Sequence, residues 1–187
     1  MNTGTLSRVA VVVLAMTFAV AMASAQLNSG AQTIALNANL TESLTLSLSA
    51  SAVNFTLAAG SANNVGSTTI TATTAWTLKP GRTAVGVYAY FGSAAAALTD
   101  GVGDNIPSSA FFISDNGGAS TALTTTVAFG GANAGYQMAN VAITGLNKAS
   151  SHTDVMAFNI NLTGGTLPQL PANTYTGTLN IQAQATP

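Results

Sequence analysis

The sequence has no cysteine, one histidine and very few charged side chains. Only 5% of its 187 residues are Asp, Glu, Lys or Arg, against about a quarter in an average globular domain. The missing cysteine excludes disulfides, thiol nucleophiles and cysteine-based metal sites. Four basic residues cannot form the positive surface that nucleic acids require, so we expect no nucleic-acid partner. A single histidine leaves little room for a catalytic relay or a transition-metal site.

The N-terminus has the three parts of a secretory signal peptide. Arg8 supplies the positive charge, residues 9–22 form an apolar stretch, and Ala23-Ser24-Ala25 is an A-x-A cleavage signal. We therefore expect residues 1–25 to be removed and residues 26–187 to form a single secreted domain in the periplasm, at the cell surface or outside the cell. The alternative is an uncleaved membrane anchor, although the apolar stretch is short for a membrane span of about 20 residues.

Cleavage would also remove Arg8 and leave a chain whose polar surface is mostly uncharged. Ser, Thr and Asn are abundant, and such a surface has little charge repulsion to oppose association. This favours a protein that assembles with copies of itself or lies against a wall or glycan. The remaining charged residues are Lys79, Arg82 and Lys148 against Glu42, Asp100, Asp104, Asp115 and Asp154.

Apolar and polar residues alternate along most of the chain, which is typical of half-buried β-strands. Clusters of Gly, Asn, Pro and Ser separate the alternating runs at near-regular spacing, and residues 94–98 are the only helix-friendly run. The pattern predicts an all-β fold, an antiparallel immunoglobulin-like β-sandwich of about nine short strands. Beside an alternating N-terminal segment, the candidate strands are residues 44–48, 53–57, 68–78, 84–91, 110–114, 123–129, 137–144, 155–163 and 175–185.

One turn is specified by its own chemistry. In Lys79-Pro80-Gly81-Arg82, proline presets its φ angle and glycine tolerates a positive one. The turn predicts a hairpin between the strands on either side of it, in which Trp76 faces Tyr88.

Two polar clusters could suggest chemistry. Ser151-His152-Thr153-Asp154 contains the residue types of a catalytic triad, but neighbours in one segment seldom converge, so we interpret it as a polar turn. Asp100 and Asp104 lie in a glycine-rich stretch and are weak calcium candidates, because Ca²⁺ prefers oxygen ligands. The spacing does not match an EF-hand, and a solvated loop is the simpler interpretation. We therefore expect no enzyme activity and no cofactor.

The aromatic residues offer a different function. Trp76, Tyr88, Tyr90 and Tyr136 could form a sugar-stacking platform for an extracellular carbohydrate-binding or adhesin module. Alternation along residues 84–91 places Tyr88 and Tyr90 on the face opposite the aliphatic side chains. The alternative is a Trp buried between the sheets with tyrosines at the rim, as is common in sandwich cores.

The C-terminal sequence LPANTYTGTLNIQA, residues 170–183, resembles the final strand of the spore coat protein U-like family, which includes archaic chaperone–usher pilins. Members of that family usually have a disulfide near the N-terminus, which this chain cannot form. The resemblance implies a subunit of a surface fibre, pilus or coat whose partners are copies of itself or related subunits, with a periplasmic chaperone as a further partner.

The resemblance also implies assembly by strand donation, in which an unpaired sheet edge takes an extended segment from a neighbour. The candidate donor lies within residues 26–40, where the alternating run of residues 32–40 forms a strand or arm. The alternative is that this segment pairs within its own domain, as N-terminal strands of sandwiches often do. The inserted face would consist of Ile34, Leu36, Ala38 and Leu40.

Overall fold

A computed structural model describes residues 27–187, so the expected signal peptide lies outside the described residues. The chain divides into two units, residues 1–39 and residues 40–187. In the first unit, residues 27–39 have no secondary structure and every one of them is exposed to solvent. No helix within residues 27–187 is long and apolar enough to cross a membrane.

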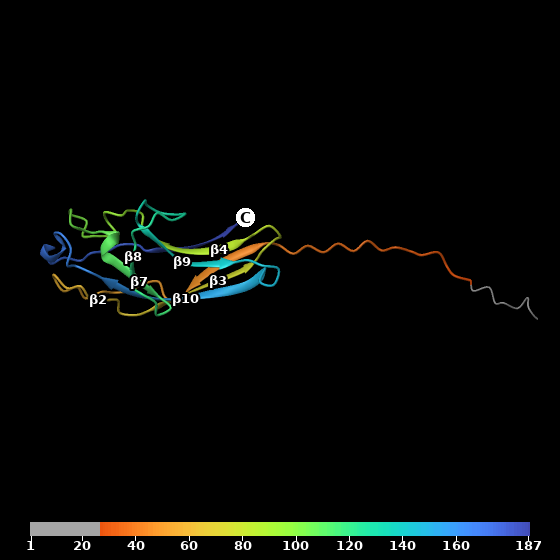
Figure 1. Cartoon of the computed structure of the whole chain (residues 1–187), viewed down its shortest axis with the longest axis horizontal. Coiled ribbons are helices and arrows are strands. Elements are labelled where there is room, and N and C mark those ends of the chain that lie inside the picture. The colour runs from red at the N-terminus through yellow and green to blue at the C-terminus, as the bar shows by residue number, and fades with distance from the viewer. Residues whose placement is uncertain (1–26) are drawn as a thin grey trace, which may run out of the picture. The chain divides into compact units, whose positions relative to one another are not determined.

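The second unit is an all-β structure made of antiparallel sheets (Figure 1). The larger sheet has the strand order β1-β3-β10-β7-β8, and β2 also pairs with β10. Residues 43–57 form one outer edge of this sheet, because β1 pairs with β3 and Phe55 forms an isolated bridge with Gly66. The strands are β1 (Ser43–Leu48), β2 (Asn64–Val65), β3 (Ile70–Thr77), β7 (Phe111–Asp115), β8 (Thr121–Ala122) and β10 (Ala149–Ile160).

The smaller sheet has the order β11-β4-β9 and faces the larger one across the core. Its outer edge on the β1 side is β11 together with the residues that precede it. A separate pair, β5 with β6, and two short 3₁₀ turns complete the unit. The bounds are β4 (Ala84–Tyr90), β5 (Leu98–Thr99), β6 (Asn105–Ile106), β9 (Gly135–Ala142) and β11 (Asn180–Thr186), with turns at Ser108–Ala110 and Leu167–Gln169.

The expected all-β antiparallel architecture is confirmed. Within residues 27–187 the structure has eleven strands, and β2, β5, β6 and β8 are only two residues long. Alternation along β4 is also confirmed, because Val85, Val87 and Ala89 are fully buried. Residues 94–98 form no helix, and Leu98 begins β5.

The predicted hairpin between the strands around Lys79–Arg82 is wrong. The turn exists, and Gly81 has a φ of 97°. However, β3 belongs to the larger sheet and β4 to the smaller one, so the turn carries the chain across the core. Trp76 therefore does not pair with Tyr88. Its side chain is 4% exposed and packs with Leu78 and Val85 between the sheets.

The core consists of two clusters that differ in how well they are closed. Around Trp76, β1 and β11 come together, and Leu44 and Ala185 complete the packing. The second and larger cluster surrounds Phe111. On its flank, residues 50–57 and 173–181 line opposite sides of one opening. The sandwich is thus closed on this side near Ala185 and open toward Tyr175.

Candidate functional site

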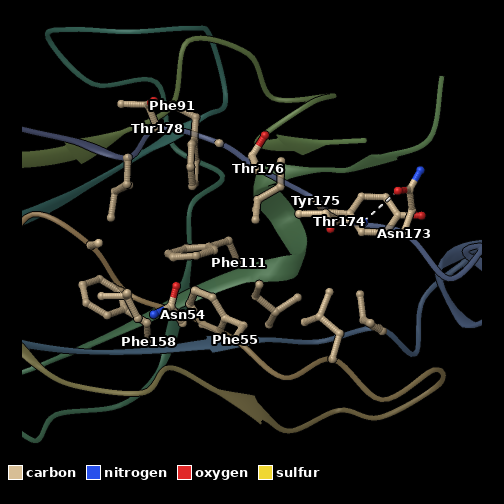
Figure 2. Close-up of a pocket in the computed structure, with 18 of the residues that line it drawn as sticks. Asn54, Phe55, Phe91, Phe111, Phe158, Asn173, Thr174, Tyr175, Thr176 and Thr178 are labelled. Carbon is tan, nitrogen blue, oxygen red and sulfur yellow. Dashed lines mark hydrogen bonds between the residues drawn. The ribbon is translucent and has the colours of Figure 1, made fainter. Parts of the chain in front are cut away.

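The opening is an apolar groove with a volume of about 840 Å³. Its floor is rich in phenylalanine: the rings of Phe91 and Phe111 meet edge to face with centroids 5.1 Å apart, and Phe55 contacts Phe111 at 5.8 Å. Figure 2 shows Phe111 between the two rims, with Phe55 on one side and Thr176 and Thr178 on the other. Met156, Phe158, Ile160 and Leu162 add a row of apolar side chains to the floor.

The first rim, residues 48–57, is paired on one side only. Asn54 accepts a hydrogen bond from the Ser67 N–H at 2.8 Å, and its own N–H donates to Ser67 Oγ at 3.1 Å. Successive residues of an extended strand direct their backbone polar groups to opposite sides. Because the backbone N–H and C=O of Asn54 both bond to Ser67, the backbone N–H and C=O groups of Val53 and Phe55 point the other way, toward the groove.

The second rim, residues 173–181, has the same property. The N–H and C=O of Thr176 both bond to Thr99, at 2.9 Å each. The backbone groups of Tyr175 and Gly177 therefore point toward the groove. Two extended segments, one at the edge of the larger sheet and one bridged to β5 and leading into β11, thus face each other across an apolar floor.

The predicted donor residues lie in the exposed N-terminal segment. Ile34 is 85% exposed, Leu36 is 89% exposed and Leu40 is 83% exposed, and Ala38 is exposed as well. Residues 32–40 contain no strand in the structure, and each of them is exposed to solvent.

The carboxylate of Asp100, one of the two calcium candidates, accepts hydrogen bonds from neighbouring residues. Asp100 Oδ1 accepts hydrogen bonds from the N–H groups of Val102, Gly103 and Asp104 at 2.9–3.1 Å. Asp100 Oδ2 accepts one from Asn173 Nδ2 at 3.1 Å. These bonds, led by that from Val102, lower the pKa of Asp100. Both carboxylate oxygens of Asp100 therefore accept hydrogen bonds. No group of three or more metal-ligating side chains occurs within residues 27–187.

The segment interpreted as a polar turn, Ser151 to Asp154, is instead part of β10. Asp154 is fully buried, and its Oδ1 lies 2.9 Å from His152 Nε2. Ser151 is exposed and alternation puts it on the opposite face of the strand. The three residue types therefore do not converge as a triad would require.

The predicted aromatic platform is only partly assembled. Trp76 is buried, and its Nε1 donates to the Asn147 carbonyl oxygen at 2.9 Å, so it offers no stacking face. Tyr136 packs against the core. Tyr88 and Tyr90 lie half-buried on the other face of β4, and both contact Phe129, with centroid distances of 5.8 and 5.9 Å.

Sequence reasoning missed the apolar groove and Phe129. The four phenylalanines of the groove floor stand far apart in the sequence, and only the fold brings them together. Comparisons with protein-family models, with curated proteins and with solved structures found no match.

Proposed function

We propose that the chain is a secreted, non-enzymatic structural subunit of a bacterial surface fibre, pilus or coat that assembles by β-strand donation. The donor is residues 32–40 of one copy, and the acceptor is the groove of the next copy. The observation that carries the proposal is the groove, in which two strand edges with inward-pointing backbone groups flank an apolar floor.

The spacing of the donor matches that of the floor. Alternate side chains of a strand lie about 6.6–6.8 Å apart on one face. The donor offers four such side chains, at residues 34, 36, 38 and 40, and the groove lining contains four alternate residues, at 156, 158, 160 and 162, which are 0–6% exposed. A strand laid along the groove would direct its apolar face toward this row.

The polar rims favour a strand over a small apolar ligand. A peptide strand satisfies unpaired N–H and C=O groups on both sides, whereas a hydrocarbon leaves them without partners, and an unpaired buried backbone group is costly. Insertion would also join the two sheets into a continuous ladder around this flank.

The short connection before β1 favours a donor from another copy. Leu40 lies within about 10 Å of Ser43, because an extended chain spans about 3.3 Å per residue. The groove begins near Leu48, about 17 Å along the same edge. Leu40 therefore cannot enter its own groove together with the rest of the donor face.

The short connection also sets the direction of insertion. Only Thr41 and Glu42 separate Leu40 from β1, so the sandwich of the donating copy lies directly beyond Leu40. The groove is blocked at the Ala185 end, where β1 and β11 meet. Leu40 consequently occupies the open end, beside Tyr175.

Polymer growth tests the proposal. The protein, purified after export, is followed by light scattering across concentration and after mild heating. We expect polydisperse, heat-resistant polymers that Ile34→Asp abolishes and Asn37→Asp preserves, since residue 37 lies on the opposite face of the donor.

Because the sequence has no cysteine, a disulfide between two copies gives a direct second test. Chains carrying Leu36→Cys are mixed with chains carrying Thr178→Cys, and the same is done with the other three donor positions. We expect mixed dimers from at least one donor position. If no polymer and no mixed dimer forms, strand donation between copies is wrong.

A second candidate function is glycan binding on the outer face of β4. The Tyr90 hydroxyl donates to Gln182 Oε1 at 2.8 Å, so amide and aromatic groups lie together beside Tyr88 and Phe129. Retention on cell-wall polysaccharides should be lost in Tyr88→Ala and Tyr90→Ala and kept in Ile34→Asp. Equal retention of the tyrosine variants and the parent protein would contradict this function.

A further inference from the structure

The cationic side chains of residues 27–187 lie together at one end of the sandwich. Arg82 Nε donates to Glu42 Oε1 at 2.8 Å, and Lys79 Nζ lies 3.6 Å from Glu42 Oε2. Lys148 Nζ donates to the Arg82 carbonyl oxygen at 3.4 Å. We call Lys79, Arg82 and Lys148 the basic end. Glu42 is the side-chain carboxylate paired with them, so positive side-chain charge is in excess there.

Two carboxylates lie at the other end, beside the open mouth of the groove. Asp100 accepts a hydrogen bond from Asn173, and Asn173 and Tyr175 line the groove. Burial and then the negative charges of Asp104 and Asp100 raise the pKa of the Tyr175 hydroxyl, so both carboxylates act on this rim. We call Asp100 and Asp104 the acidic end.

Figure 1 shows how the strands separate the two ends. The turn from β3 to β4 and the loop from β9 to β10, which carry the basic residues, lie at the end where β1 begins. The loop between β5 and β6, which carries Asp100 and Asp104, lies at the opposite end of the strands. The other two acidic residues, Asp115 and Asp154, lie in β7 and β10.

We propose that the basic end of one copy docks against the acidic end of the next and that this attraction orients the two copies during assembly. The proposal rests on the proposed function, which supplies the contact between successive copies. It adds a second interface, made of side-chain charges, to the strand held in the groove.

The inserted strand brings the two ends together. Glu42 follows Leu40 by two residues, a distance of about 7 Å in an extended chain. With Leu40 beside Tyr175, the basic end of the donating copy therefore adjoins the acidic end of the accepting copy. The Debye length at physiological ionic strength is about 8 Å, so charges at this junction attract each other across short gaps.

Because the rest of the surface carries little charge, the opposite charges of the two ends dominate the electrostatic attraction between copies. Few other charges compete with the two ends, and complementary potentials accelerate encounter and suppress wrong orientations. Two basic ends or two acidic ends repel each other, so only head-to-tail approach is favoured, which is the arrangement that strand donation requires.

The growth rate of polymers, measured by light scattering from about 20 to 500 mM NaCl, tests the inference. Electrostatic steering predicts a rate that falls at least threefold with added salt. Lys79→Gln should slow growth about threefold or more at low salt. Gln137→Glu is the matched control, because it changes the net charge by the same amount on the exposed face of β9.

A charge-conserving variant separates attraction from damage to the fold. Lys79→Glu brings the side-chain charge of the basic end to zero, and Asp104→Lys does the same at the acidic end, so each should slow growth about tenfold at low salt. Asp104→Glu keeps the charge and should grow like the parent protein. Circular dichroism spectra confirm that each variant is folded.

The outcomes distinguish this inference from the proposed function. Growth that is independent of salt and of the single substitutions overturns the electrostatic interface and leaves strand donation standing. An Asp104→Glu variant as slow as Asp104→Lys also overturns it. Failure of the parent protein to polymerise at any salt concentration overturns both.

Discussion

Phe91 and Phe111 join the two sheets at the floor of the groove, with ring centroids 5.1 Å apart and ring planes at 84°. Phe91 directly follows β4 of the smaller sheet, and Phe111 begins β7 of the larger one. Both side chains are less than 5% exposed. An edge-to-face pair of this kind adds about 0.5–1.5 kcal/mol to the stability gained from burial alone. The same pair therefore stabilises the fold and lines the groove.

Truncating this pair should destabilise the fold strongly. Phe111→Ala removes a buried ring and leaves a cavity, so we expect a loss of about 3–5 kcal/mol in the free energy of unfolding, measured in urea. Phe112→Ala is the control, because Phe112 is only half-buried and lies on the other face of β7. Equal losses in the two variants would show that Phe111 does not hold the sheets together.

Trp76 should act as a core residue and as a single fluorescent reporter. It is the only tryptophan in the sequence and is 4% exposed, so its emission should shift to longer wavelength on unfolding. Trp76→Ala should cost about 3–5 kcal/mol, and Tyr88→Ala about 1 kcal/mol or less. Urea unfolding followed by circular dichroism measures both. A mild Trp76→Ala variant would contradict the buried placement.

Local patterns in the sequence predicted most of the longer strands but not their partners. Residues 53–57 and 123–129, expected as strands, contain only isolated bridges at Phe55 and Thr125, because neither segment pairs over more than one residue. Alternation along residues 84–91 identified the buried face of β4, because that face depends only on the period of the strand. The turn at Pro80 and Gly81 was also evident, yet a turn specifies a reversal of the chain and not the sheet that the next strand joins. Trp76 and Tyr88 were paired wrongly for this reason.

The groove could not be predicted because it lies between two segments that do not pair with each other. The residues predicted as a donor carry a local signal, the alternation from Ile34 to Leu40. The groove depends on two segments about 125 residues apart in sequence, near Phe55 and near Leu179, which no period or motif connects. Phe129 was missed as a neighbour of Tyr88 because its contact arises from a loop that folds back over β4.

Asp100 should stabilise the protein at neutral pH and lose this effect in acid. The N–H of Val102 and further donors hold the pKa of Asp100 below its ordinary value of 3.8. A lowered folded-state pKa contributes stability above the unfolded value, and that stability disappears as the pH falls through the folded value. Asp100→Asn should therefore be less stable at pH 7 and show a weaker dependence on pH below about 4. Parallel curves for the two proteins in urea titrations would contradict this.

Asp115 should behave in the opposite way. Burial, followed by the negative charge of Asp154, raises the pKa of Asp115 above 3.8, and its Oδ1 is buried without a hydrogen-bond partner among the described residues. Between the unfolded and folded pKa values the folded state binds more protons, so stability falls as the pH rises. Asp115→Asn should thus be more stable than the parent at pH 7. The gain should vanish in acid below about pH 4, and a variant that is less stable at pH 7 would contradict the assignment.

Gly177 should be required for the second rim of the groove. A Cβ atom at this position would overlap the Ala97 carbonyl oxygen and come within 3.2 Å of Leu98 Cα, so the rim must move away from its neighbour to accept any side chain. Such movement strains the adjacent pair between Thr176 and Thr99, whose two hydrogen bonds hold the rim.

We therefore expect Gly177→Ala to lose about 1–3 kcal/mol in urea unfolding, as overpacked sites do, and to capture donor strands less well in the disulfide assay. Gly164→Ala is the matched control, because nothing lies within 4 Å of a Cβ built there, and it should be close to neutral. If Gly177→Ala matches that control in both measurements, the rim is not held by close packing against Ala97.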